Sequence, residues 1–202
     1  MILFVDTETT GLPLDYSAPP SATSMWPRLV EISWLLYDED GTEVESASHI
    51  IFPSGFRIPE AATLKHGISD SQARSEGAPL EYTLRLFHSA LCRSGLLVGH
   101  NIGYDVSIIA AESYRLTVPK GAIKRLLEHP TACTMQSSTE FCMLPNRFPG
   151  GGEYKWPKLE ELHQKLFGEG FTGSHRAAVD VAATARCYFE LQRQGIIGGA
   201  RD

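Results

Sequence analysis

Four acidic residues and one histidine have types and neighbours that indicate chemistry. Asp6 and Glu8 lie in FVDTETTG, Asp105 in VGHNIGYDVSII, and His175 with Asp180 in GSHRAAVD. Each carboxylate adjoins an apolar run that predicts a strand or a buried helix, where a charge costs several kcal/mol unless it is paired or bound to metal. No basic residue lies beside Asp6 and Glu8 in sequence to pair with them. We therefore expect a divalent cation site, with His175 as the proton acceptor next to it.

The first two carboxylates are placed by a strand. Asp6 and Glu8 follow the apolar run 2–5 and are separated by one residue. Alternate side chains of a strand share a face, so both carboxylates point the same way, on the face that carries Ile2 and Phe4. They lie at the carboxyl end of the strand, which is where α/β sheets usually place their sites.

The other two carboxylates are placed by helices. Asp105 falls near the first turn of a helix, where the positive helix end favours a negative charge. Asp180 lies among the apolar residues of the last helix. Four converging carboxylates repel one another, and two divalent cations about 3.5–4 Å apart relieve that repulsion. Hard oxygen ligands, without a Cys or His cluster, favour Mg²⁺, with Mn²⁺ as a substitute, over zinc.

His175 lies five positions before Asp180. Within one helix this offset would place the two side chains about 140° apart, so they would not face one site. We therefore expect His175 to precede the helix, on the Gly173-Ser174 segment, from which it can swing toward the metals. A histidine with a pKa near neutrality suits removal of a proton from water at the site.

The elements that must position these residues form one mixed sheet. Asp40-Gly41 between two β-rich runs predicts a hairpin. A β-meander followed by alternating helices and strands predicts an α/β fold, with five strands flanked by helices. The expected strands are 2–5, 28–38, 43–51 and 96–99, with a brief strand or turn at 131–135, and the expected helices are 58–66, 79–93, 103–116, 119–128, 135–144, 158–168 and 176–194. Residues 13–27 and 145–157 have no hydrophobic period and predict loops.

Composition sets broader limits. The chain has 202 residues, 43% hydrophobic and 21% charged, which predicts one globular domain over 1–202, with a core of about 1–193 and a short C-terminal tail. No membrane span and no leader are evident, and the four cysteines form no CxxC pair, so we expect a cytoplasmic protein with reduced thiols. The net charge of −6 argues against tight binding of long nucleic acid through phosphates. It favours a short substrate footprint or a partner that delivers the substrate.

Together the motifs resemble the DEDDh branch of the DnaQ-like 3′–5′ exonuclease family. The first motif is matched by Asp6-Thr7-Glu8-Thr9-Thr10-Gly11, the second by His100-Asn101 with Asp105, and the third by His175 with Asp180. A minor HGI motif is matched within Lys65-His66-Gly67-Ile68-Ser69. The related DEDDy branch has a tyrosine four residues before the last Asp, where this chain has Arg176. The resemblance extends from residue 1 to about residue 193.

The resemblance implies a ribonuclease-H-like fold and release of nucleoside 5′-monophosphates from a 3′ end. It implies that the four carboxylates hold two metals and that His175 is the general base. The residues that it implies at the terminal nucleotide are Thr9, Thr10, Leu12, Leu64, His66 and Asn101. The favoured substrate is single-stranded DNA, in proofreading or end-trimming, with any polymerase acting as a partner in trans. RNA 3′-end trimming is the alternative, and a non-catalytic interaction module is a third reading.

Several of these residues also have simpler interpretations. The first motif by itself would fit a solvated strand end, Asp105 a helix-start charge, and His175 an ordinary loop histidine. His100 is better explained as a hydrogen-bonded structural histidine than as a ligand. His66 fits a substrate contact and a helix end equally well. Trp34 predicts core, while Trp26 and Trp156 lie in the two loops, where stacking on bases is the less favoured reading.

Overall fold

The computed structural model describes residues 1–147 and 152–198. Within these residues, five strands form one sheet in the order β3-β2-β1-β4-β5. The pairs β1–β2 and β2–β3 are antiparallel, while β1–β4 and β4–β5 are parallel. This confirms the predicted mixed sheet. The strands are β1 (Ile2–Thr9), β2 (Leu29–Tyr37), β3 (Glu43–Ile50), β4 (Leu96–Gly99) and β5 (Thr131–Cys133).

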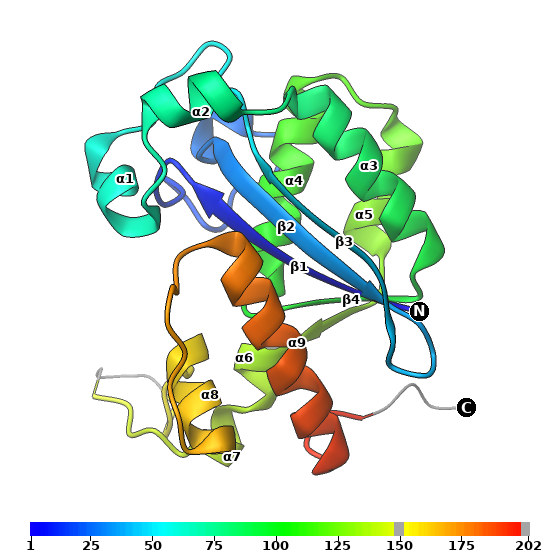
Figure 1. The fold of residues 1–202 in the computed structure, drawn as a ribbon, viewed down its shortest axis with the longest axis vertical. Helices are drawn as coiled ribbons and strands as arrows, with labels where there is room; N and C mark the ends of the chain where they lie inside the picture. Colours follow the sequence, from blue (N-terminus) through cyan, green and yellow to red (C-terminus); the bar gives the residue numbers. More distant parts are fainter. Residues whose placement is uncertain (148–151, 199–202) are drawn as a thin grey trace.

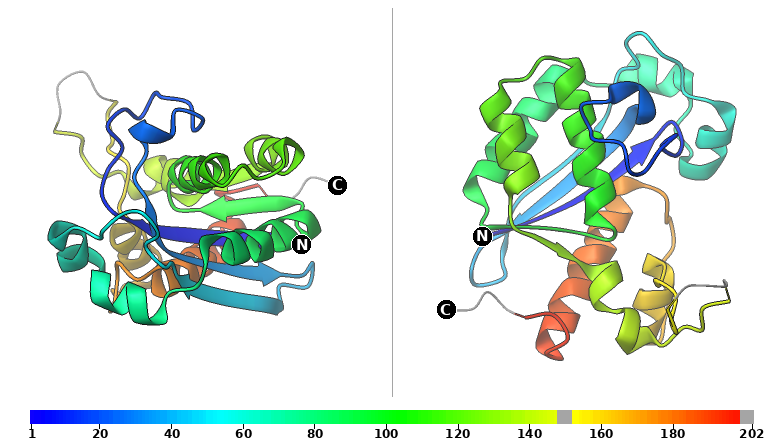
Figure 2. Two further views of the ribbon diagram at one scale, coloured as in Figure 1. Left: turned by 90° about the horizontal axis from the view of Figure 1, so that it is seen from above. Right: turned by 180° about the vertical axis from the view of Figure 1, so that it is seen from behind.

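Helices cover both faces of the sheet (Figure 1). The core on one face joins β1 and β2 to α3, α4 and α5, and the core on the other joins them to α8 and α9. Seen from behind, α4 and α5 lie on the side of the sheet opposite α9 (Figure 2). The helices are α1 (Glu60–His66), α2 (Asp70–Glu76), α3 (Leu80–Arg93), α4 (Ile102–Arg115), α5 (Lys120–Glu128), α6 (Thr134–Ser137), α7 (Thr139–Cys142), α8 (Leu159–Phe167) and α9 (Ala177–Arg193).

The predicted hairpin joins β2 to β3. Gly41 takes a left-handed φ of 76°, which Asp-Gly turns favour, and its N–H donates to the carbonyl of Asp38. The Asp38 carboxylate also accepts from the backbone N–H groups of Asp40 and Thr42. The turn thereby sets the register of β2 against β3.

The structure departs from the predicted elements in three places. Helix α2 was not predicted, because Ala73 is its one buried residue and a polar helix shows no hydrophobic period. Its start is marked instead by Ser69, whose hydroxyl accepts from the N–H of Gln72. The predicted helix 135–144 is divided into α6 and α7, and β1 continues beyond 2–5 to Thr9.

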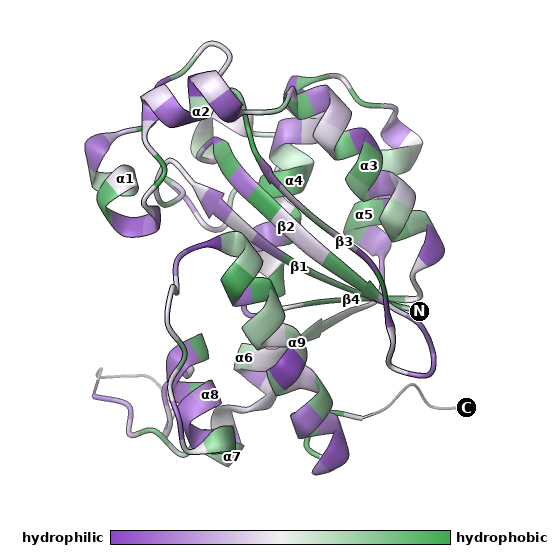
Figure 3. Ribbon diagram, in the orientation of Figure 1, coloured by the Kyte–Doolittle hydropathy of each residue, from purple (hydrophilic) through white to green (hydrophobic). Residues whose placement is uncertain are grey.

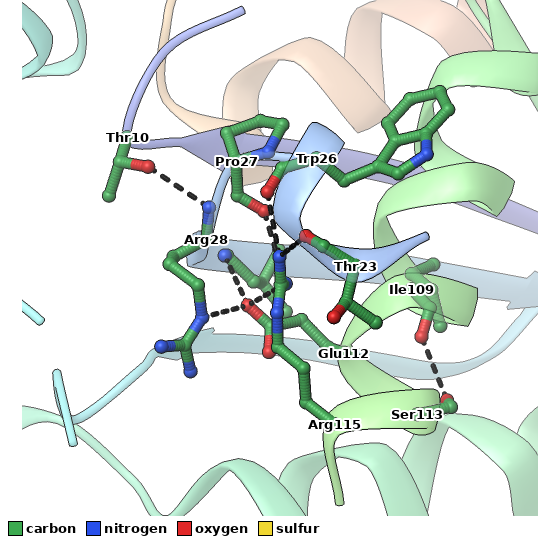
Figure 4. Close-up of polar contacts among 10 residues, drawn as sticks. Thr10, Thr23, Trp26, Pro27, Arg28, Ile109, Glu112, Ser113 and Arg115 are labelled. Atoms are coloured by element: carbon green, nitrogen blue, oxygen red, sulfur yellow. Dashed lines mark hydrogen bonds and ion pairs between the residues drawn. The ribbon is translucent and has the colours of Figure 1, made fainter. Parts of the chain in front are cut away.

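Loop 13–27 contains a short 3-10 helix, Thr23–Met25, and is tied to α4 (Figure 4). Arg115 donates to the carbonyls of Trp26 (2.7 Å) and Pro27 (3.2 Å). Glu112, fully buried, accepts from Arg28 Nε at 2.8 Å and from the Leu29 N–H at 2.9 Å. These contacts hold the loop against the helix. Residues 148–151 of the other predicted loop, 145–157, and residues 199–202 of the predicted tail lie outside the described residues.

The hydropathy of β1 changes along its length (Figure 3). Its first residues are apolar, with Leu3 and Val5 in one core and Phe4 in the other, whereas its carboxyl end is polar. Polar residues at the end of a buried strand mark the point at which the strand leaves the hydrophobic core. Among the described residues, no helix combines the length and apolar character that crossing a membrane requires.

Candidate active site

The end of β1 sends its side chains to two sides of the sheet. Phe4, Asp6 and Glu8 face α9, while Thr7 and Thr9 face α4, as the alternation of a strand requires. The Thr7 hydroxyl donates to Asp105 Oδ1 at 2.7 Å. Asp105 is 3% exposed, so this bond fixes a buried carboxylate beside β1. The alternation therefore supplies two carboxylates directly and orients a third.

Asp180 and His175 reach the site from the start of α9. His175 precedes the helix, as predicted, and has a left-handed φ of 68°. Its backbone N–H donates to Asp180 Oδ2 at 2.9 Å. The backbone at His175 is thus held in place, and any swing toward the site is confined to the side chain. Figure 1 shows the arrowhead of β1 between α1 and the start of α9.

The donor set suits a divalent cation. One ligand atom each from Glu8, His175 and Asp180 lies within 4.8 Å of the others. Asp180 Oδ1 is buried and has no hydrogen-bond partner among the described residues. A buried carboxylate oxygen left without a donor is costly, and a cation satisfies it. Asp6 and Asp105 lie outside this close group, although their charges act on each other.

The electrostatics of the metal-free site are unfavourable. Loss of hydration on burial is the main cause that raises the pKa of Glu8 to about 7, of Asp105 to about 7 and of Asp180 to about 6. The pKa of Asp6 is also raised well above its ordinary value, by burial and then by the charges of Asp105, Asp180 and Glu8. Lys65 of α1 acts in the opposite direction on the pKa of Glu8. Such clustered, raised carboxyl pKa values are typical of functional sites.

An ion pair that sequence reasoning missed anchors the start of α9. Glu31 of β2 lies opposite Glu8 in the sheet, and its side chain is 1% exposed. It accepts from Arg176 Nη2 at 2.8 Å and from the Ala177 N–H at 2.9 Å. Arg176 occupies the position of the DEDDy tyrosine. Its ion pair with Glu31 ties the start of α9 to β2, next to His175 and Asp180. Its sequence signal is a charge inside an apolar run, LVEISW, the same anomaly that marks Asp6.

Removing the two partners of this pair is expected to have unequal effects on stability. Arg176→Ala leaves the buried Glu31 carboxylate with the Ala177 N–H alone and should cost about 2–3 kcal/mol of unfolding free energy. Glu31→Gln should cost roughly 1 kcal/mol or less, because Arg176 is half-exposed and stays hydrated. Urea denaturation of the two variants measures the difference. Equal losses of unfolding free energy in the two variants would show that the unpaired charge of buried Glu31 is not the cause of the destabilisation.

Next to the carboxylates lies a pocket of about 360 Å³. Thr9, Thr10, Leu12 and Asn101 line it, so the structure brings four of the predicted substrate residues together. Sequence reasoning missed Tyr104, whose hydroxyl lies 2.7 Å from Thr9 Oγ1 and donates to the carbonyl of Gly11. The sequence indicates Tyr104 only through its position next to Asp105. Tyr16, of the anchored loop, and Lys65 also line the pocket.

The other two predicted substrate residues lie outside this lining. Leu64 is 81% exposed on α1, and His66, at the end of the same helix, is buried. His66 Nδ1 accepts from the N–H of Ile68, and its Nε2 has no partner in the part of the chain that the structure describes. Burial lowers the pKa of His66. Its geometry is that of a helix end.

His100 is held in a structural role. Its ring nitrogens lie 2.9 Å from Thr134 Oγ1 and 3.0 Å from the carbonyl of Pro157. Burial lowers the pKa of His100 to about 4, so the ring is neutral at physiological pH. Nε2–H therefore donates to the carbonyl, and Nδ1 accepts from the threonine. Both ring nitrogens are used within the protein, which agrees with the structural interpretation.

Comparison with known proteins gives a family and relatives. The model of a family described as Exonuclease matches residues 3–188. CP81 of Escherichia phage 186, named as an uncharacterized exonuclease, is 28% identical over 202 residues, which cover 96% of this chain and 89% of that protein. DNA polymerase III subunit epsilon of Treponema pallidum is 28% identical over 186 residues, which cover 92% of this chain and 72% of the subunit.

A solved structure shares the fold. The zinc-bound form of Escherichia coli exonuclease I with single-stranded DNA superimposes with a TM-score of 0.72 at 20% identity. The match covers 96% of this chain but 40% of that chain. The agreement confirms the predicted ribonuclease-H-like fold.

Proposed function

Since this chain belongs to the exonuclease family, as a DnaQ-like 3′–5′ exonuclease, we propose that it acts on the 3′ ends of single-stranded DNA, in proofreading or end-trimming. It releases nucleoside 5′-monophosphates. The observation that carries the proposal is the convergence of four carboxylates with raised pKa values beside a nucleotide-sized pocket. The family uses divalent metals, and Asp6, Glu8, Asp105 and Asp180 would hold two Mg²⁺ ions here, with Mn²⁺ as a substitute.

Each group then has one task. When bound, the cations neutralise charge on the phosphate and lower the pKa of water. His175 accepts the proton of the attacking water, while Asp180, bonded to the His175 backbone, holds that residue at the site. The water oxygen bonds to phosphorus, and the bond to the 3′-oxygen of the preceding nucleotide breaks; that oxygen keeps the electron pair and takes a proton from solvent. Thr9, Thr10, Leu12 and Asn101, which line the pocket beside the carboxylates, hold the terminal nucleotide.

DNA is favoured over RNA by the relatives. The epsilon subunit of Treponema pallidum is a DNA polymerase component, and exonuclease I was solved with single-stranded DNA. The epsilon subunit, a component of a polymerase, also supports a polymerase partner in trans. Mg²⁺-dependent release of mononucleotides from matched single-stranded DNA and RNA oligonucleotides tests the proposal, with EDTA as the control. Preference for RNA would replace DNA as the substrate, and release from neither would overturn the proposed function.

Replacing His175 separates proton transfer from binding. His175→Ala should lower kcat by about 10²–10⁴-fold with a nearly unchanged oligonucleotide Kd, because the base acts on water and not on the strand. Turnover and fluorescence-anisotropy binding measure the two quantities. His129→Ala, distant from the site, is the matched control. A large loss of binding would instead assign His175 to positioning the substrate.

A further inference from the structure

Trp156 differs from the other two tryptophans. Trp34 is 1% exposed and packs in the core, as predicted, and Trp26 is 6% exposed, with its indole N–H donating to the carbonyl of Ala18. Trp156 is 61% exposed and lies three residues before Leu159, where α8 begins. A large exposed aromatic side chain loses the hydrophobic stabilisation that burial would bring. Two of the three indoles are thus explained by packing, and Trp156 is not.

Trp156 shares a cavity with the candidate catalytic residues. A groove of about 660 Å³ is lined by Glu8, His175 and Asp180 and also by Trp156 and Lys158. The groove adjoins the smaller pocket of the terminal nucleotide, because Glu8, Lys65 and Asn101 line both. A strand whose last nucleotide fills the smaller pocket therefore continues into the groove. The nucleotide next to the terminal one would then enter the groove that Trp156 lines.

The backbone around Trp156 is fixed before any substrate binds. The carbonyl of Pro157 accepts from His100 Nε2 at 3.0 Å. Glu161 accepts from the Lys158 N–H at 2.8 Å and from Lys155 Nζ at 2.6 Å. The residues on both sides of the indole are thus tied to His100, which follows β4, and to α8. An aromatic side chain on a preorganised backbone loses little conformational freedom when a ligand covers it.

Stacking also suits the charge of this protein. With a net charge of −6, phosphate contacts alone are a weak source of affinity. Base–aromatic stacking tolerates any sequence, which a trimming enzyme needs, because every base has a π-face. Lys158 and Lys65 also line the groove, so two positive charges beside the indole are available to phosphates. The groove thus combines an aromatic surface with two cations, the combination that single-stranded nucleic acid binds.

We propose that Trp156 stacks on the base next to the terminal nucleotide, the base that becomes terminal after each cleavage. The assignment rests on the proposed function, since it takes the smaller pocket as the site of the terminal nucleotide. Stacking at this position keeps the shortened strand bound while the released mononucleotide leaves. Trp156 is then a binding residue for the retained strand and touches no reacting atom.

Tryptophan fluorescence tests the contact without turnover. An unlabelled oligonucleotide, titrated in EDTA, should quench the exposed Trp156 and leave Trp26 and Trp34 unchanged. Trp156→Phe should remove the quench and retain most of the affinity, since phenylalanine also stacks. Absence of a quench in the wild-type protein, or an equal quench in Trp156→Phe, would overturn the proposal.

A cycle with an abasic substrate tests which base is contacted. Removing the base next to the terminal nucleotide should weaken wild-type binding by about 5- to 150-fold. Trp156→Ala should weaken binding of the intact strand similarly and show almost no further loss on the abasic strand. Tyr82→Ala, an exposed aromatic on α3, is the matched control. If the abasic penalty persists in Trp156→Ala, the proposal fails, whereas failure of the wild-type protein to release any nucleotide contradicts only the proposed function.

Discussion

Asp6→Asn is expected to lower nucleotide release by at least about 10³-fold and to stabilise the metal-free protein. The activity falls because a metal ligand is lost, and metal stabilisation of the transition state is worth several kcal/mol. Stability rises because burial and the charges of Asp105, Asp180 and Glu8 all disfavour the ionised form of Asp6 in the folded protein. Asparagine has no such charge. Relief of that repulsion should contribute about 0.5–2 kcal/mol, as is common when a strained site is neutralised.

The two effects of Asp6→Asn are measured by mononucleotide release in Mg²⁺ and by urea unfolding in EDTA. Glu128→Gln neutralises an exposed carboxylate of α5 and should change neither. Adding Mg²⁺ should reverse the order of stability, because the wild-type protein keeps the full ligand set. A variant that loses both activity and metal-free stability would show that Asp6 has a structural role, which would contradict the metal-site assignment.

The second large effect concerns pH and metal. Mg²⁺ should stabilise the protein strongly at pH 7.5 and hardly at pH 5, because protons compete with the cation for carboxylates with raised pKa values. The pKa of Glu8 rises from 4.5 to about 7 and that of Asp105 to about 7. For Glu8 alone, a shift of this size makes protonation in the folded protein about 3 kcal/mol more favourable than in the unfolded chain. At 100 times Kd, Mg²⁺ adds about 2.7 kcal/mol.

The sign of the metal-free trend follows from the same carboxyl groups. A carboxyl whose pKa is raised by folding stabilises the protein below its unfolded pKa, and that stability is lost as pH rises through its folded pKa. Buried histidines such as His100, with a lowered pKa, act in the opposite direction below about pH 6.5. The contribution of the carboxyl groups to stability is therefore separated from that of the buried histidines at pH 6.5–7.5, where the carboxyls titrate and the histidines stay neutral. Urea midpoints in EDTA should fall across this window, and a rise would contradict the raised carboxyl pKa values.

Much of the fold follows from local sequence patterns. Alternation at Phe4, Asp6 and Glu8 predicts one shared face of a strand, and the structure has it. The five-residue offset of His175 from Asp180 correctly places the histidine before the helix. Helix α2 shows where such reasoning fails, because a polar segment held by the Ser69 cap carries no hydrophobic period. Hydrophobic periodicity reflects buried side chains, so a helix that buries almost none of its side chains cannot be predicted from it.

The sequence by itself determined which groups are anomalous: four carboxylates in apolar surroundings, a histidine at a fixed offset and a strand to align two of the acids. The tertiary structure decided which groups meet. It placed Thr7 against Asp105, 98 positions away, and Arg176 against Glu31, 145 positions away. It also buried Trp26 and left Trp156 exposed. The physical reason is range: side-chain period and helix ends depend on neighbours in sequence, whereas burial and ion pairing depend on the path of the whole chain.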